Sequence, residues 1–118
     1  CYADANLVEV AVLNLINNAA EAMRRMDNEK KIIVSSGITG IHIFIKVSDS
    51  GPGVPLALRD KVFDPFFTTK WDGTGIGLSL CHRIARDHQG HIRVGKSRLG
   101  GAAFTFEIPI RRDGTPDD

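Results

Sequence analysis

The chain has 118 residues, of which 42% are hydrophobic and 25% are charged, and its formal net charge is +1. This composition is typical of one globular domain, and so small a net charge excludes the positive field that binding to nucleic acid or an anionic membrane requires. The two cysteines, Cys1 and Cys81, have no metal-ligand spacing and favour a reducing, cytoplasmic compartment. Because the sequence starts at Cys1 without a methionine, we expect a fragment of a longer protein, which another segment could anchor in a membrane.

The N-terminal part predicts one long helix. Asp4 or Asn6 can cap its start, and the pattern runs to about Met26, where Asp27-Asn28 ends it. Its apolar residues go nearly all the way round, which predicts a well-buried helix. They are Leu7, Val8, Val10, Val12, Leu13, Leu15, Ile16, Ala19, Ala20, Ala22 and Met23.

A β-hairpin is expected next. Residues 31–36 alternate weakly and are rich in Ile and Val, and Ile38-Thr39-Gly40 is expected to form the turn. Residues 41–47 form a clear strand pattern, because apolar side chains recur at every second position. Those on one face are Ile41, Ile43, Ile45 and Val47.

The second half repeats the order of helix and strands. Residues 55–62 predict a short helix with Pro55 at its first position, and a second long helix is expected from Thr74 or Gly75 to His88, stopped near Gln89-Gly90. Within this helix, Cys81 is expected to be a small core residue.

The last strands are expected at 91–94 and 103–108, with Pro109 ending the second one or placing it at an edge. The order helix, two strands, helix, two strands predicts an α+β sandwich whose largely antiparallel sheet is covered by helices on one face. The domain is expected to span 1–112, with a frayed tail at 113–118.

Three asparagines interrupt the first helix. Asn14 and Asn18 are four residues apart and therefore share one face, where two amide oxygens can accept hydrogen bonds from a ligand or bind a hard cation such as Mg²⁺. The alternative is a pair of core asparagines paired with backbone groups. Asn17 points elsewhere, and we expect it to be structural.

The second polar feature is Asp49-Ser50-Gly51-Pro52-Gly53, at the end of a predicted strand. A carboxylate fixed there can read an exocyclic amine such as that of adenine, and Gly51 and Gly53 allow the backbone to pass close to a flat ring. The alternative is a plain turn.

A loop with three phenylalanines, Phe63-Asp64-Pro65-Phe66-Phe67-Thr68-Thr69-Lys70, follows the short helix. Because exposed phenylalanines are costly, the loop is expected either to be anchored on the core or to dock onto another surface. Lys70 is either a point charge for a phosphate or a solvated surface lysine.

The segment Gly73-Thr74-Gly75-Ile76-Gly77 opens the second long helix, whose N-terminus can bind an anion. Its G-x-G-x-G spacing after a loop excludes a Rossmann dinucleotide site, and the chain contains no P-loop sequence. The four histidines (His42, His82, His88 and His91) have no partners at metal-ligand spacing.

These segments, in this order, resemble the ATP-binding catalytic domain of sensor histidine kinases, in the superfamily shared with gyrase, MutL and the large heat-shock chaperones. The resemblance covers nearly the whole chain, from about residue 4 to residue 109. The matching segments are the asparagine box Asn14-Leu15-Ile16-Asn17-Asn18-Ala19, the glycine box Asp49-Ser50-Gly51-Pro52-Gly53, the phenylalanine box from Phe63 to Lys70, the second glycine box Gly73-Thr74-Gly75-Ile76-Gly77-Leu78, and the last small box from Gly101 to Phe106.

The resemblance implies the Bergerat fold, a mixed sheet of about five strands behind three helices, with Cys1–Ala3 as the stub of the first strand. It implies that Asn18 holds Mg²⁺ on the ATP phosphates, with Asn14 beside it, and that Asp49 hydrogen-bonds the adenine amine near Gly51 and Gly53. Phosphate contacts are implied for Lys70, Thr74, Gly75, Ile76, Gly77 and Leu78.

Two departures refine the expected function. Gyrase-type ATPases place a glutamate base where this chain has Asn14, and an amide cannot take a proton from water, so transfer of the γ-phosphoryl group is favoured over hydrolysis. Many sensor kinases also carry a lysine where this chain has Glu21. The run from Asn18 to Met23 instead resembles the nitrogen-regulation and C4-dicarboxylate sensor branch, and whether Arg24 or Arg25 replaces that lysine stays open.

The resemblance further implies partners. The acceptor histidine of the family lies in a helical dimerisation domain, typically as H-E-x-x-x-P, and this sequence has no such run. The chain is therefore expected to bind Mg-ATP, to act as the catalytic domain of a histidine protein kinase on an acceptor domain in cis or in a dimer partner, and to reach a response regulator only indirectly. The alternatives are an ATPase or serine kinase of the same superfamily, or a nucleotide-binding regulatory module without catalysis.

Overall fold

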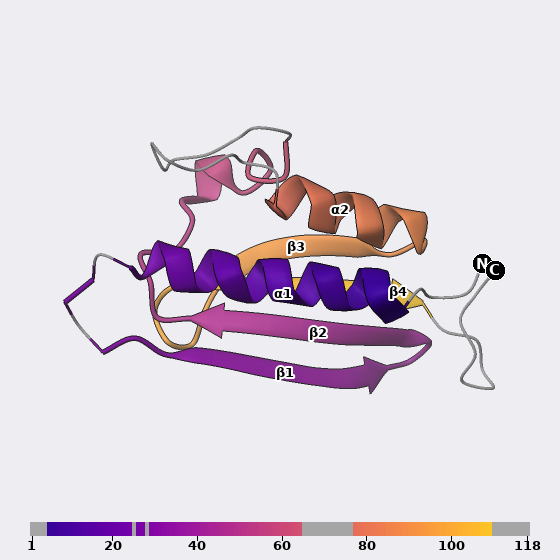
Figure 1. The fold of residues 1–118 in the computed structure, drawn as a ribbon, viewed down its shortest axis with the longest axis horizontal. Helices are drawn as coiled ribbons and strands as arrows, with labels where there is room; N and C mark the ends of the chain where they lie inside the picture. Colours follow the sequence, from indigo (N-terminus) through magenta and orange to yellow (C-terminus); the bar gives the residue numbers. More distant parts are fainter. Residues whose placement is uncertain (1–4, 25, 28, 65–76, 110–118) are drawn as a thin grey trace.

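The computed structural model describes residues 5–24, 26–27, 29–64 and 77–109. Within these residues, two α-helices and four strands follow one another in the expected order, with one short 3-10 helix between β2 and α2 (Figure 1). The elements are α1 (Ala5–Ala22), β1 (Ile32–Thr39), β2 (His42–Asp49), η1 (Leu56–Leu58), α2 (Gly77–Asp87), β3 (His91–Lys96) and β4 (Ala102–Pro109).

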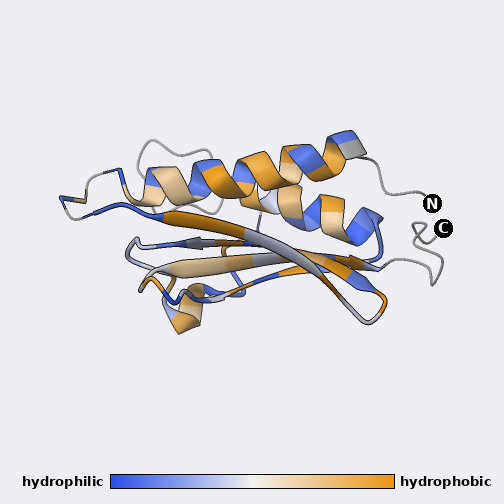
Figure 2. Cartoon of the chain, turned by 90° about the horizontal axis from the view of Figure 1, so that it is seen from below, coloured by the Kyte–Doolittle hydropathy of each residue, from blue (hydrophilic) through white to orange (hydrophobic). Residues whose placement is uncertain are grey.

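The four strands form one sheet in the order β1-β2-β4-β3, and every described pair is antiparallel. Both α-helices lie on one side of this sheet, which confirms the predicted α+β sandwich (Figure 2). The registers pair Val47 with Phe104 and Ile45 with Phe106, so that alternate residues of β2 and β4 meet on the helix-covered face. The expected strand stub at Cys1–Ala3 and the tail at 113–118 lie outside the described residues.

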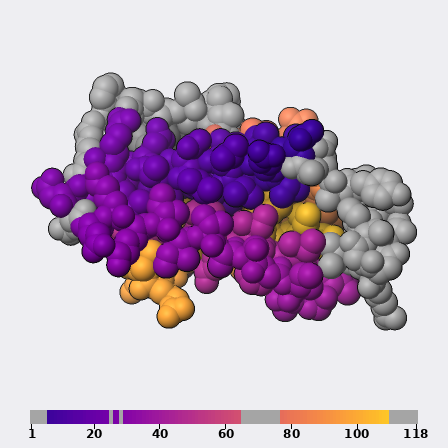
Figure 3. Space-filling view, turned by 60° about the horizontal axis from the view of Figure 1, so that its bottom comes forward, coloured from indigo at the N-terminus to yellow at the C-terminus, as the bar shows by residue number. Residues whose placement is uncertain are grey.

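The core lies between the helices and the two central strands. Its largest fully buried apolar side chains are Phe104, Phe106, Leu15 and Val47. Helix α1 packs mainly on α2 and then on β2, and it lies along the surface of the molecule beside β1 and β2 (Figure 3).

The prediction that α1 is well buried all round is wrong. The helix buries one stripe at a spacing of four residues, whereas large apolar residues on its first turn and on its other faces stay 39–52% exposed. Among the described residues, α1 packs on α2 and on the β1–β2 side of the sheet, and no second helical layer covers its remaining faces. The buried residues are Ala11, Leu15, Ala19 and Met23, and the exposed ones are Leu7, Val10 and Leu13.

Several predicted boundaries also differ. Helix α1 ends at Ala22 instead of about Met26, and β1 continues to Thr39, so the turn lies at residues 40–41 and Ile41 is half exposed rather than part of the strand face. The short helix predicted at 55–62 shrinks to one 3-10 turn at Leu56–Leu58, followed by further turns. Element ends depend on local capping, which residue patterns predict least well.

The loop phenylalanine Phe63 is anchored on the core. Its ring stacks on His82 of α2 with centroids 5.8 Å apart, and it meets the buried Phe104 edge-on at 6.1 Å. This packing gives Phe63 a structural role in anchoring the loop, and it gives His82 a structural role in place of metal binding. Phe66 and Phe67 lie outside the described residues.

Cys81 is a core residue, as predicted. It is fully buried, and its Sγ atom donates a hydrogen bond to the carbonyl oxygen of Ala11 at 3.3 Å, which joins α2 to α1. Burial raises the pKa of the Cys81 thiol from 9.0 to about 12, because a thiolate is poorly solvated there. Among the described helices, none is long and apolar enough to cross a membrane.

We therefore expect Cys81 to be inert toward thiol reagents in the folded chain. In a Cys1→Ser variant at pH 8, labelling should be roughly a thousandfold slower than in urea, because the raised pKa lowers the thiolate fraction by about three powers of ten. Between pH 9 and 12 the unfolded thiol loses its proton while the folded one keeps it, so stability should fall as the pH rises. Fast labelling under native conditions would contradict this assignment; urea denaturation at pH 8 and pH 10 measures the second effect.

Candidate functional site

Asp49, at the end of β2, is the buried carboxylate of the predicted adenine end, with 2% of its surface exposed. Its Oδ1 atom accepts hydrogen bonds from the backbone N–H of Gly51 at 2.9 Å and of Ala102 at 3.0 Å. Two such bonds stabilise a carboxylate that would otherwise be costly to bury, and they fix its orientation.

The other oxygen of Asp49, Oδ2, has no hydrogen-bond partner among the described residues. No described side-chain nitrogen or oxygen is both fully buried and unpaired, so Oδ2 keeps an opening to solvent. Oδ2 is therefore the oxygen of this carboxylate that stays able to accept an N–H donor from a ligand.

Backbone packed directly on Asp49 shapes this end of the site. The N–H of Gly101 donates to the Asp49 carbonyl oxygen at 3.2 Å, and a Cβ atom on Gly101 would collide with Asp49 Oδ1 and lie 2.5 Å from the Gly51 nitrogen. Gly53 takes φ +79, which L side chains rarely adopt, and passes over the Gly101 backbone. Sequence reasoning noted the box beginning at Gly101 but did not assign Gly101 or Ala102 to the site.

Helix α1 supplies the polar pair of the site. Asn14 and Asn18 are half-buried, and neither side chain makes a hydrogen bond to another described residue. The alternative, that these amides are paired with backbone groups in the core, is therefore wrong for the described part of the chain. Asn17, between them, is exposed.

Asn14 of this pair faces the start of α2. A Cβ atom placed on Gly77, the first residue of α2, would lie 3.5 Å from Asn14 Oδ1. The asparagine box thus lies beside the helix N-terminus, where N–H groups without intrahelical partners and the helix dipole attract an anion. Leu78 follows as the second residue of α2, with its side chain packed against the core.

One stripe of α1 joins this end to the aspartate end. Ala22 lies on the same face as Asn14 and Asn18, because the three are spaced by four residues, and its Cβ is 3.7 Å from where a Cβ on Gly51 would be. The stripe covers about 12 Å at a rise of about 1.5 Å per residue. The stripe therefore runs from the N-terminus of α2, past the unpaired amides of Asn14 and Asn18, to Gly51 at the aspartate end.

Four predicted site residues are not placed. Lys70, Thr74, Gly75 and Ile76 lie outside the described residues, so their contacts to phosphates stay predictions.

Comparison with known proteins identifies the family of the chain. Residues 3–112 match the family model described as histidine kinase-, DNA gyrase B-, and HSP90-like ATPase. The signal transduction histidine-protein kinase AtoS of Escherichia coli is 40% identical over 112 residues, and the C4-dicarboxylate transport sensor protein DctS of Rhodobacter capsulatus is 36% identical over 115 residues. These matches cover 95% and 97% of this chain but only 18% of each relative.

Solved structures agree with the fold. The catalytic domain of histidine kinase ThkA, in a nucleotide-free form, superposes with a TM-score of 0.79 at 40% identity, over 91% of this chain and 68% of that one. Full-length ShkA, solved in complex with AMPPNP, gives a TM-score of 0.74 at 29% identity, over 94% of this chain and 23% of that one. The chain therefore belongs to the histidine kinase-, DNA gyrase B- and HSP90-like ATPase family, and within it to the catalytic domains of histidine kinases.

Proposed function

We propose that this chain binds Mg-ATP along the stripe of α1 and donates the γ-phosphoryl group to a histidine on a separate helical dimerisation domain. The observation that carries this proposal is that one face of α1 brings Asn14 beside the start of α2 and Ala22 beside Gly51, with Asn18 between them in the helical repeat. The phosphates then lie at the N-terminus of α2, and the adenine amine donates to Asp49 Oδ2.

The amide pair fits a magnesium ion. Mg²⁺ prefers oxygen ligands and keeps several waters, so one or two protein oxygens beside a triphosphate suffice, and the amides of Asn14 and Asn18 have no competing partner among the described residues. In this proposal Asn18 holds the ion and Asn14 lies beside the ion or the phosphates. The bound ion would neutralise charge on the β- and γ-phosphates.

The chemistry of Asn14 favours phosphoryl transfer over hydrolysis. An amide has no basic site that can take a proton from water, so the chain has no general base where the ATPases of the superfamily carry a carboxylate. What remains is positioning and charge neutralisation, which suit transfer to an external nucleophile such as an imidazole. A response regulator would then receive the group from that histidine and not from this chain.

A transfer assay in trans tests the proposal. With labelled ATP and Mg²⁺, a second polypeptide carrying an H-E-x-x-x-P helix pair of the family should gain acid-labile, alkali-stable phosphate only when this chain is present. The isolated chain should stay unlabelled, because none of its four histidines lies in such a run. Acid-labile label on this chain itself would refute the proposal, and multiple-turnover hydrolysis without acceptor would favour the ATPase alternative.

A further inference from the structure

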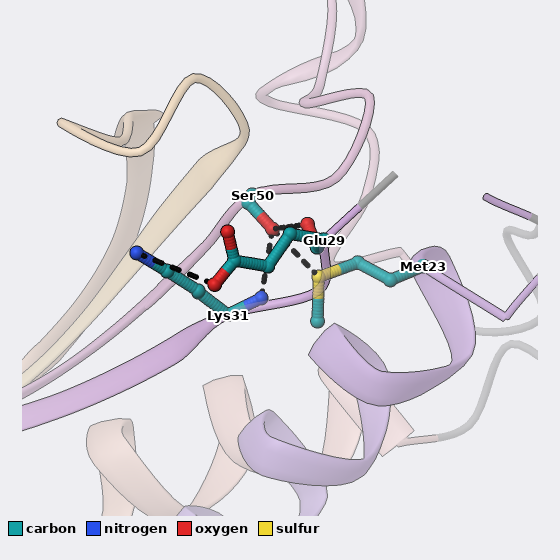
Figure 4. A network of polar contacts seen from close by, with 4 residues as sticks. All are labelled: Met23, Glu29, Lys31 and Ser50. Carbon is teal, nitrogen blue, oxygen red and sulfur yellow. Dashed lines mark hydrogen bonds and ion pairs between the residues drawn. The ribbon is translucent and has the colours of Figure 1, made fainter. Parts of the chain in front are cut away.

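Ser50, the residue after Asp49, is the centre of a polar network that none of the site assignments uses (Figure 4). Its Oγ atom accepts a hydrogen bond from the backbone N–H of Lys31 at 2.9 Å. The hydroxyl proton has two acceptors at 3.3 Å, Met23 Sδ and the carbonyl oxygen of Glu29. One hydroxyl thereby joins the residue after α1, the segment that enters β1 and the end of β2.

The contacts with Lys31 extend the β1–β2 ladder by one residue. The last register pair is Ile32 with Asp49, and beyond it the Ser50 N–H donates to the Lys31 carbonyl oxygen at 3.1 Å. With the Lys31 N–H returning to Ser50 Oγ, both backbone groups of Lys31 are bonded to Ser50. Asp49 is therefore enclosed on both sides by paired residues instead of forming the frayed end of a strand.

The contact with Met23 connects the Ser50 hydroxyl to Gly51, which lies on the other side of the carboxylate. Met23 is 2% exposed, and its Cγ atom lies 3.2 Å from where a Cβ on Gly51 would be. The side chain that meets the Ser50 hydroxyl thus also lies against Gly51, whose N–H orients Asp49 Oδ1. By contrast, the Lys31–Glu29 ion pair at 3.6 Å is exposed at both ends and contributes little.

We propose that Ser50 is a positioning residue for adenine recognition: its hydroxyl holds β2 to α1 and to the start of β1, so that Asp49 Oδ2 stays aimed at the adenine amine. This inference rests on the proposed function, in which Asp49 reads that amine. Ser50 itself touches no substrate in this scheme. The hydroxyl acts through the backbone on either side of Asp49.

The test measures dissociation constants for two nucleotides in the presence of Mg²⁺. One is ATP, and the other is purine ribonucleoside triphosphate, which lacks the 6-amino group. In Ser50→Ala we expect ATP to bind about 3- to 10-fold more weakly, the range for one lost neutral hydrogen bond, and the amine-free nucleotide to change less than about twofold. A merely structural role of Ser50 would weaken both nucleotides equally.

Two further variants separate the effect of the hydroxyl group from the effect of side-chain shape. Ser50→Thr should restore ATP affinity and Ser50→Val should not, because valine has the shape of threonine without the hydroxyl. If Ser50→Ala folds poorly, the comparison of Ser50→Thr with Ser50→Val still tests the role of the hydroxyl. Ser35→Ala is the matched control, since Ser35 is exposed on β1 and should leave both constants unchanged.

The outcomes distinguish this inference from the proposed function. If the unmodified chain prefers ATP over the amine-free nucleotide and Ser50→Ala keeps the same preference, or if Val restores ATP affinity as well as Thr, the role of Ser50 is wrong while the site stands. If the unmodified chain binds both nucleotides equally, the placement of Asp49 at the adenine amine is itself wrong.

Discussion

Asn18→Ala is expected to weaken binding of Mg-ATP roughly 100-fold, since loss of even an outer-shell partner of a metal can cost 10- to 100-fold. The half-buried amide of Asn18 has no partner among the described residues, so its removal breaks no internal contact there. Alanine is also the better helix former, so the thermal unfolding midpoint should stay the same or rise slightly. Isothermal titration with ATP, with and without Mg²⁺, measures the effect.

The control for this variant lies one residue away. Asn17→Ala makes the same chemical change on the exposed face of α1 and should bind Mg-ATP like the unmodified chain. With EDTA, the unmodified chain and Asn18→Ala should bind ATP alike, because the amide acts through the ion. If Asn18→Ala keeps the full magnesium dependence of ATP binding, Asn18 does not hold the metal ion.

Asp49→Asn should weaken ATP binding by about 2–3 kcal/mol, which is roughly 30- to 150-fold in Kd. Oδ1 must remain an acceptor, because it receives the N–H groups of Gly51 and Ala102. The asparagine NH₂ group then takes the place of Oδ2, and a donor faces the donor amine of adenine. Equilibrium titration with ATP measures the loss.

The amine-free nucleotide again separates recognition from folding. For purine ribonucleoside triphosphate, Asp49→Asn should cost only a few-fold, and unfolding in urea should show a folded protein because the Oδ1 contacts persist. Asp49→Ala should reduce both the affinity for the amine-free nucleotide and the stability in urea, since it leaves the N–H groups of Gly51 and Ala102 unpaired in a buried place. Equal losses for both nucleotides in Asp49→Asn would show that the carboxylate does not read the amine.

Local patterns determined much of the architecture. The alternation of helices and strands, the place of Asp49 near a strand end and the buried Cys81 follow from periodicity and turn residues, which act between near neighbours in the chain. The same holds for the shared face of Asn14 and Asn18, because the helical repeat alone brings residues four apart together. These features were predictable because each depends on a few adjacent residues.

The extent of burial was not predictable in the same way. The apolar residues of α1 go nearly all round the helix, yet Leu7, Val10 and Leu13 stay exposed. An apolar pattern shows which residues favour burial, whereas the number of layers packed around the helix decides which of them are buried.

Only the tertiary structure decided how the aspartate end is built. Asp49 and Ala102 are 53 positions apart and meet through the register of β2 and β4, and Ser50 meets Met23 and Lys31 through the packing of α1 beside β1. That packing selects which carboxylate oxygen is bonded inward and which stays open. The sequence by itself determined which chemical groups are present and on which helix face or strand end they lie. Their partners depend on long-range register, because hydrogen bonds require distances near 3 Å that spacing along the chain does not specify.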